Sequence, residues 1–254
     1  MADSKLDNVS IYDCTSQWGV FSIAGPKSRN FLKKLVVSED PDKTLSNKQF
    51  PWLSYRDIEI GMCPVRALRV AYTGELGWEL HHPIEMQNYL LDILLSSGKE
   101  FNLKLVGARA QNWLRQEKSY KAFGSDLGRD AGPFESKLSR FVDINKNFLG
   151  KDALLKRKTD VSCVTLLIDG PKDIDPWGRE ALYNETESSM LGRLTSAGYS
   201  VHFKRSIGIG YVKSSFSEVG TKLRIKIDDA FWDAEIVRDS PYDPQNERII
   251  DRVQ

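Results

Sequence analysis

A β-hairpin is predicted by residues 65–80, V-R-A-L-R-V-A-Y-T-G-E-L-G-W-E-L. Val65–Tyr72 and Trp78–Leu80 are short runs rich in the apolar and aromatic side chains that strands favour. The five residues between them, T-G-E-L-G, contain two glycines, which tolerate the backbone conformations of a tight turn. We therefore expect two paired strands with a carboxylate, Glu75, at the turn that joins them.

Helices and a further strand are expected around this hairpin. The strand is expected at 18–23. A helix opens at Gly25-Pro26, with proline at its first position and with Phe31, Leu32 and Leu35 on its apolar side. Residues 38–48 are expected to form a polar loop, and two further helices are expected from Pro83 to Gly98 and over 107–120. This mixture of elements predicts an α+β region for residues 1–158.

The pattern changes after residue 158. Residues 124–134 are expected to be a loop and 149–158 a short helix, and β-rich runs then follow at 161–168, 206–212, 223–227 and 231–237. Short strands separated by glycine, proline, aspartate and serine are typical of a small sandwich or barrel. We therefore predict a C-terminal all-β barrel domain over residues 159–254.

The composition excludes several classes of protein. The chain has 36 basic and 35 acidic residues and a net charge of +1, whereas domains that grip nucleic acid are usually basic. It contains no apolar run long enough to span a membrane and no secretory signal, so neither a membrane nor a secreted protein is expected.

Cysteine and histidine usage points to a metal-free protein of a reducing compartment. Cys14, Cys63 and Cys163 are few and far apart, which indicates a cytoplasmic location. His81 and His82 are adjacent, and adjacent side chains on a strand point to opposite faces, so no metal site is expected.

Glu75 is the first candidate binding residue. Its two carboxylate oxygens suit a ring that presents two adjacent N–H donors, such as an aminopyrimidinone. The flanking Gly74 and Gly77 would let a planar ligand approach closely. The alternative is a hairpin turn with a solvated glutamate, and spacing alone does not decide between the two.

Two arginines of the helix expected at 107–120 are further candidates. Arg109 is near the helix start and suits an acidic ligand group, or else belongs to a solvated face. Arg115 with Glu117 is expected to form structural hydrogen bonds. Basic residues also alternate at Leu223–Ile227, but acidic residues interrupt them, so nucleic acid is an unfavoured partner.

Eight motifs run in the order of one known family. They are A-G-P-K-S at 24–28, Y-T-G-E-L-G-W-E at 72–79, G-A-R at 107–109 with L-R-Q-E at 114–117, P-F-E at 133–135, F-L-G-K-D at 148–152, L-T-S-A-G at 194–198, I-G-I-G-Y at 207–211 and Y-D-P at 242–244. Together they resemble the folate-dependent aminomethyltransferases: the glycine-cleavage T-protein and the folate domains of dimethylglycine and sarcosine dehydrogenases.

The resemblance implies a fold, a cofactor and three binding residues. The fold is a partial aminomethyltransferase folate-binding fold followed by the family's C-terminal barrel. The cofactor is tetrahydrofolate, with Glu75 holding the pterin, Arg109 positioning the cofactor and Tyr72 beside it. Ala110 replaces the aspartate usual in T-proteins, and Y-K-A-F-G at 120–124 is more similar to the dehydrogenase-linked and oxidase-linked members.

The resemblance also implies an activity whose catalytic residue is unknown here. Family members carry a further stretch before the segment that begins this chain, and the catalytic aspartate lies in it. The expected function is therefore transfer of a one-carbon unit from a small amine or N-methylamine to tetrahydrofolate, if a partner subunit or missing segment completes the site. The alternatives are a non-catalytic folate-binding subunit of a split oxidase or dehydrogenase, and a folate protein related to RNA modification.

A chain without that stretch is also expected to leave apolar surface uncovered in its first domain. We therefore expect association or marginal stability when it is studied alone.

Overall fold

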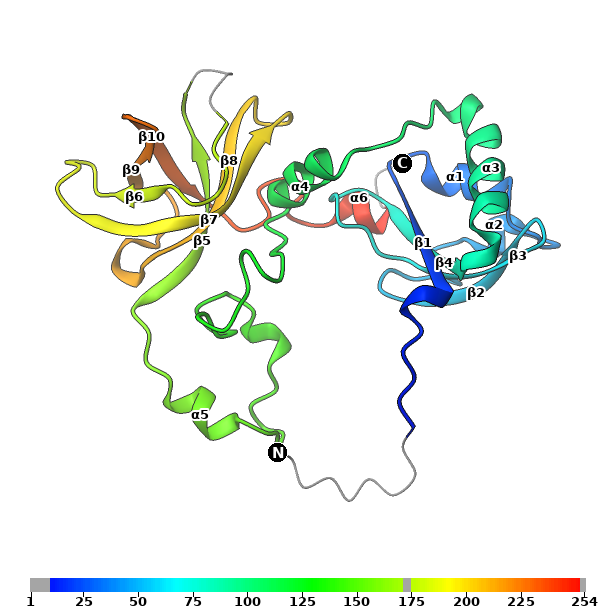
Figure 1. Cartoon of the computed structure of the whole chain (residues 1–254), viewed down its shortest axis with the longest axis horizontal. Coiled ribbons are helices and arrows are strands. Elements are labelled where there is room, and N and C mark those ends of the chain that lie inside the picture. The colour runs from blue at the N-terminus through cyan, green and yellow to red at the C-terminus, as the bar shows by residue number, and fades with distance from the viewer. Residues whose placement is uncertain (1–9, 171–174, 252–254) are drawn as a thin grey trace. The chain divides into compact units, whose positions relative to one another are not determined.

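Two compact units make up the computed structural model, which describes residues 10–170 and 175–251 (Figure 1). Unit 1 consists of the chain up to Ala71, Glu75–Leu105 and the C-terminal residues from Arg248. Unit 2 consists of Tyr72–Gly74 and Val106–Glu247. The predicted division into an α+β folate-binding region at 1–158 and a barrel domain at 159–254 stays a prediction.

Unit 1 is built on an antiparallel sheet with the strand order β1-β4-β3-β2. The strands are β1 (Trp18–Ala24), β2 (Tyr55–Ile60), β3 (Cys63–Leu68) and β4 (Gly77–Pro83), and the helices are α1 (Ser28–Lys33), α2 (Pro41–Thr44) and α3 (Gln87–Gly98). Short 3-10 turns lie at Thr15–Gln17, Ile84–Met86 and Lys99–Phe101. The predicted hairpin is confirmed, since Leu68 of β3 pairs with Glu79 of β4.

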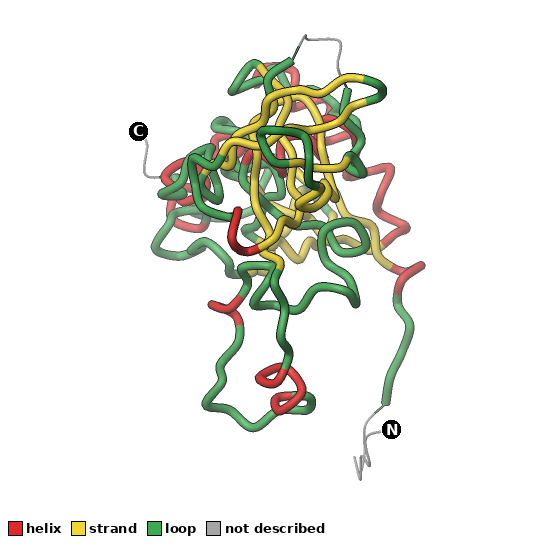
Figure 2. Tube along the Cα trace, turned by 90° about the vertical axis from the view of Figure 1, so that its left-hand side faces the viewer, coloured by secondary structure: helices red, strands yellow, loops and turns green. Residues whose placement is uncertain are grey.

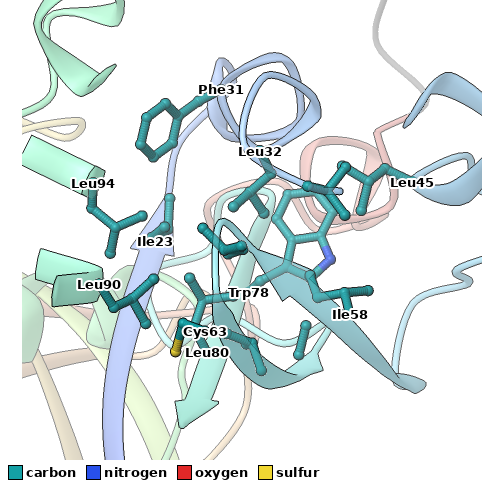
Figure 3. Packing of buried hydrophobic residues seen from close by; sticks show 14 of the residues in the cluster. Ile23, Phe31, Leu32, Leu45, Ile58, Cys63, Trp78, Leu80, Leu90 and Leu94 are labelled. Atoms are coloured by element: carbon teal, nitrogen blue, oxygen red, sulfur yellow. The ribbon is translucent and has the colours of Figure 1, made fainter. Parts of the chain in front are cut away.

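One face of this sheet carries the core of unit 1. Phe31 and Leu32 of α1 and Leu90 and Leu94 of α3 are buried in one apolar cluster with the inward residues of all four strands (Figure 3). Trp78 of β4 is completely buried at its centre. Every second residue of β3, starting at Cys63, is buried, as a sheet covered on one face requires.

Unit 2 contains a closed barrel with the strand order β10-β5-β8-β7-β6-β9. Figure 2 draws its strands, like those of the unit 1 sheet, in yellow. The strands are β5 (Val161–Ile168), β6 (Ala181–Tyr183), β7 (Met190–Ser200), β8 (Arg205–Lys213), β9 (Lys222–Ile227) and β10 (Ala230–Val237). The helices of unit 2 are α4 (Ala108–Glu117), which packs on β7 and β8, and α5 (Lys151–Lys156). A further helix, α6 (Glu247–Ile250), begins at the last residue of unit 2. Short 3-10 turns lie at Ser139–Phe141 and Ser214–Phe216. The α+β region and the C-terminal barrel are thus confirmed.

Several local predictions need correction. Pro26 does not begin α1, because Gly25 at φ +129° and a turn at Pro26 and Lys27 precede the first helical residue, Ser28. The strand predicted at 65–72 ends at Leu68, since the backbone N–H of Arg69 donates instead to the carbonyl oxygen of Ser54.

Other elements were not predicted at all. They are α2, which lies inside the expected polar loop 38–48, the short helix α6, and the strands β2, β6 and β7. The helices expected at 107–120 and 149–158 are confirmed but shorter, at Ala108–Glu117 and Lys151–Lys156.

Within residues 10–170 and 175–251, no helix has the length and apolarity needed to cross a bilayer. The same residues contain no group of three or more histidine, cysteine, aspartate or glutamate side chains arranged to hold a metal ion. His82 is buried with Nδ1 2.9 Å from the Leu80 carbonyl oxygen, while the half-buried His81 places Nε2 3.1 Å from Glu79 Oε2.

The buried thiol of Cys163 and the half-buried phenol of Tyr211, which are opposite each other on β5 and β8, predict a loss of stability at alkaline pH. Burial raises the pKa of the Cys163 thiol to about 11 and that of the Tyr211 phenol to about 12. The unfolded chain releases these protons at lower pH than the folded chain does, so the free energy of unfolding falls as the pH rises above about 9. Below that pH both states keep the protons and neither group contributes.

Urea unfolding between about pH 8 and pH 11 measures this effect. Cys163→Ala is expected to remove up to about 2 kcal/mol of the alkaline loss. Cys14→Ala is the control, because Cys14 is exposed, and it should leave the slope unchanged. Equal slopes in the wild type and Cys163→Ala would show that the thiol does not carry the effect.

Candidate functional site

The loop Thr73–Gly77 is held by close packing at both of its glycines. Gly74 has φ +81°, and a Cβ built there would lie 2.5 Å from Cγ of Lys118. A Cβ on Gly77 would lie 2.6 Å from the carbonyl oxygen of Ile23. Protein atoms therefore occupy the space beside each glycine, so these glycines allow close packing within the protein. The sequence had instead suggested that they leave room for a ligand.

Lys118 supports the Gly74 end of this loop from inside unit 2. Its side chain is fully buried, and Nζ donates to the carbonyl oxygen of Asp243 at 2.6 Å and to Oδ1 of Asn246 at 2.8 Å. The aliphatic stem passes under Gly74, whose would-be Cβ also lies 3.3 Å from Cδ1 of Tyr242. One lysine thus connects the glycine before Glu75 to the turn at residues 243–246.

Glu75 lies on the unit 1 side of the loop. Its side chain is only 22% exposed, and Oε1 is 3.4 Å from Nη1 of Arg248. The solvated hairpin turn that the spacing left open does not describe this largely shielded carboxylate. Its carboxylate lies beside a cationic neighbour, the guanidinium of Arg248.

Tyr72 begins the segment and lies in unit 2. Its ring is stacked on that of Tyr120, with centroids 5.9 Å apart and an angle of 11° between the ring planes. Burial raises the pKa of both phenols, so both stay neutral at physiological pH. The pair places two parallel aromatic rings at the start of the segment, two residues before Gly74.

Arg109 lies over two indole rings in unit 2. Its guanidinium carbon lies 5.3 Å from the ring centroid of Trp113 and 5.4 Å from that of Trp177, and Nη2 forms an ion pair with Asp175. The side chain is nevertheless 57% exposed. Arg109 therefore has features of both expected alternatives, a solvated helix face and a site for an acidic group. It is exposed and it binds a carboxylate of its own chain, while the two indoles restrict its orientation.

Arg115 and Glu117 form structural hydrogen bonds, as the sequence predicted. Both side chains are buried, and Glu117 accepts hydrogen bonds from Ser200 Oγ and from the backbone N–H of His202. Arg115 forms an ion pair with Asp126, which is also buried, and donates to Ser196 Oγ at 2.6 Å. These contacts fix α4, and so Arg109, to the barrel.

Asp126 is the centre of this network. Its Oδ1 accepts hydrogen bonds from Thr195 Oγ1 at 2.5 Å and from Ser196 Oγ at 2.7 Å, and its Oδ2 accepts from the Ala122 N–H at 2.9 Å. Successive strand residues normally face opposite sides, but a shift of register between Leu194 and Ser196 turns both hydroxyls toward one carboxylate. Neither Asp126 nor Lys118 has a local signal in the sequence, because their contacts join segments far apart in the chain.

The three predicted binding residues are thus placed as follows. Tyr72 and Arg109 lie in unit 2 and Glu75 in unit 1. Gly74 and Glu75 are neighbours in sequence at the point where the chain returns from one unit to the other.

A change at Gly74 measures how strongly the loop depends on Lys118. Gly74→Ala is expected to lower the free energy of unfolding by about 2 kcal/mol, from the left-handed backbone and the clash with the lysine stem. Gly124→Ala is the matched control, because Gly124 has φ +94° and no heavy atom within 4 Å of its would-be Cβ. It should cost only about 1 kcal/mol. Equal losses in urea unfolding would contradict the packing role of Lys118.

Two family models match the chain. The GCVT N-terminal domain matches residues 1–146, and the glycine cleavage T-protein C-terminal barrel domain matches residues 162–243. The first covers more than half of the chain, and the second covers the barrel strands from β5 to β10.

Whole-chain comparisons agree with these matches. The mitochondrial dimethylglycine dehydrogenase of Mus musculus is 36% identical over 239 residues, which are 91% of this chain and 26% of the mouse protein. An aminomethyltransferase of Caldanaerobacter subterraneus is 29% identical over 87% of this chain and 59% of its own length. The chain therefore spans about a quarter of the first relative and less than two thirds of the second.

The fold is shared with a solved structure. The glycine cleavage system aminomethyltransferase T from Bartonella henselae superposes with a TM-score of 0.74 at 21% identity, over 89% of this chain and 60% of that one. At this identity the likeness shows the fold alone.

Proposed function

The chain belongs to the glycine cleavage T-protein (GCVT) family, and from that premise we propose that it binds tetrahydrofolate and serves one-carbon transfer to it. The observation that carries the proposal is the loop Thr73–Gly77, which holds a shielded carboxylate beside an arginine at the position the family resemblance assigns to the pterin. The proposal concerns binding first and transfer second.

The residues present fit a reduced pterin. Its aminopyrimidinone ring offers adjacent N–H donors, and the two oxygens of Glu75 accept such a pair in the fork geometry of carboxylate recognition. Tyr72 supplies a flat apolar surface whose orientation Tyr120 fixes. These side chains bind and orient the cofactor, and when bound it supplies the secondary nitrogens that accept a one-carbon unit.

Arg109 fits an anionic group of the same cofactor. Its guanidinium pairs with the carboxylate of Asp175, and this ion pair supports a carboxylate as the ligand group at the same place. A carboxylate of folate would take the place of Asp175. The two indoles keep the guanidinium oriented for that exchange at little further cost in entropy.

Catalysis is proposed only for a completed site. The described residues include no carboxylate that we assign to proton transfer, so a partner subunit or a further segment would supply it. The one-carbon donor is then a small amine or N-methylamine. Without that completion, the chain is a folate-binding subunit. A reducing compartment such as the cytoplasm fits its three free cysteines.

Glu75→Gln tests the assignment of the pterin carboxylate. The amide keeps the shape but turns one acceptor into a donor, so the affinity for 5-formyltetrahydrofolate is expected to fall about 10- to 100-fold. Glu85→Gln is the control, because Glu85 is exposed, and it should bind like the wild type. Calorimetric titration that gives all three proteins the same dissociation constant would remove Glu75 from the site.

A further inference from the structure

The ion pair between Arg109 and Asp175 joins two residues of unit 2 that are 66 positions apart in the chain. Both groups are open to water, since the side chain of Arg109 is 57% exposed and that of Asp175 is 39% exposed. Exposed ion pairs add little to the stability of a fold, because water screens them. The pair nevertheless places an internal carboxylate on the guanidinium that is assigned above to a carboxylate of the cofactor.

The segment at residues 175–180 is fixed to the barrel by contacts that do not involve Arg109. Three successive backbone N–H groups, those of residues 177–179, donate to the carboxylate of Glu180 at 2.6 to 2.8 Å. The carbonyl oxygen of Glu180 accepts a hydrogen bond from the N–H of Leu194 in β7 at 2.9 Å. The segment therefore keeps its backbone position without the ion pair.

Gly178 brings the backbone of this segment directly against β7. It has φ +96°, and a Cβ built there would lie 2.6 Å from Cα of Ser196 and 2.9 Å from the carbonyl oxygen of Thr195. Trp177, one residue earlier, is 78% exposed, and its ring centroid lies 5.4 Å from the guanidinium carbon of Arg109. A fixed backbone thus places both an indole and a carboxylate at Arg109.

A carboxylate held beside a guanidinium competes with every carboxylate that arrives from solution. Because Asp175 belongs to the fixed segment, its effective concentration at Arg109 is high, and a ligand carboxylate has to displace it. The displacement is feasible, since an ion pair that water reaches is weak. A neutral ligand at this place would instead separate the two charges without forming a new ion pair.

We propose that Asp175 is an internal competitor at Arg109, which lowers the affinity for an anionic ligand and selects against neutral ones. The proposal names a specificity-determining residue, and it rests on the proposed function, in which Arg109 binds a carboxylate of folate. The opposite role is that Asp175 orients Arg109 for the ligand. The two roles differ in sign, because removal of a competitor strengthens binding, whereas removal of an orienting residue weakens it.

Asp175→Asn tests the proposal, because the amide keeps the shape of the side chain and removes its charge. The variant is expected to bind 5-formyltetrahydrofolate about 2- to 5-fold more tightly than the wild type in calorimetric titration. Asp169→Asn is the matched control, since Asp169 also forms an exposed ion pair in unit 2, with Arg205 at 2.7 Å. It loses the same charge and should bind like the wild type.

A second probe, para-aminobenzoylglutamate, separates this inference from the folate proposal. It has the carboxylates of folate but no pterin, so it should also bind Asp175→Asn about 2- to 5-fold more tightly than the wild type. Adding Arg109→Ala should abolish either gain. If only this probe bound and showed the gain, the competitor would stand and the pterin assignment would fail.

Three results would overturn the proposal while the folate site stands. They are equal or weaker binding of both probes by Asp175→Asn, a gain that persists in Arg109→Ala, and an equal gain in Asp169→Asn. No binding of either probe by the wild type or by Asp175→Asn would overturn the internal competitor together with the folate site.

Discussion

Asp126→Ala is expected to lower the free energy of unfolding by about 3–5 kcal/mol, the largest effect of any single substitution considered for this chain. The substitution leaves the buried guanidinium of Arg115 without its carboxylate and removes the acceptor of the Thr195 and Ser196 hydroxyls. An unpaired charge in a dry interior costs far more than the lost pair contributes, because water no longer solvates it.

Urea unfolding followed by circular dichroism measures this change. Asp229→Ala is the control, because Asp229 is an exposed aspartate in the turn between β9 and β10, and it should change the free energy by less than about 0.5 kcal/mol. If Asp126→Ala unfolded at the same urea concentration as Asp229→Ala, the network would not be what fixes α4 to the barrel.

Gly198→Ala is expected to cost about 3 kcal/mol. A Cβ on Gly198 would lie 2.0 Å from Cδ1 and 2.3 Å from Nε1 of Trp113, closer than any real contact, so the indole must leave its place on β7. The same indole flanks Arg109. The substitution therefore disturbs both the packing of α4 and the orientation of the arginine proposed for the cofactor.

Gly208→Ala provides the comparison on the neighbouring strand. Its would-be Cβ lies 3.0 Å from the two terminal methyl groups of Leu194, which shift by rotation, so the expected cost is about 1 kcal/mol. Thermal unfolding distinguishes the two variants. A Gly198→Ala protein as stable as Gly208→Ala would mean that α4 and Trp113 are not seated on the barrel as described.

The barrel was largely predictable because its apolar residues follow the period of strands. Leu223–Ile227 alternates buried and partly exposed residues, so the strand β9 is visible in the sequence. Strand β7 is not, since Gly192 and Gly198 lie where a Cβ would clash with Tyr211 O and Trp113, while Thr195 and Ser196 are polar because they bond Asp126. The residues of β7 are thus determined by contacts with residues that are distant in the sequence and close only in the fold.

The sequence indicates the candidate binding residues, which stay predictions, but it does not indicate their contacts. The motif T-G-E-L-G indicates Glu75, yet Arg248, its neighbour, is 173 positions away in the chain. The sequence also gives no sign that Arg109 contacts both Trp113 and Trp177, because the second indole belongs to a distant segment. Periodicity reports which face of an element is buried, whereas long-range polar contacts leave no local pattern.

Titration of the purified chain with tetrahydrofolate, followed by intrinsic tryptophan fluorescence, tests the central claim most directly. Trp113 and Trp177 lie beside Arg109, so a ligand that displaces Asp175 should change their emission. The account predicts saturable binding with a dissociation constant in the micromolar range (about 1–100 μM). No saturable change up to about 1 mM ligand would contradict it, and the family likeness would then describe the fold of this chain but not its function.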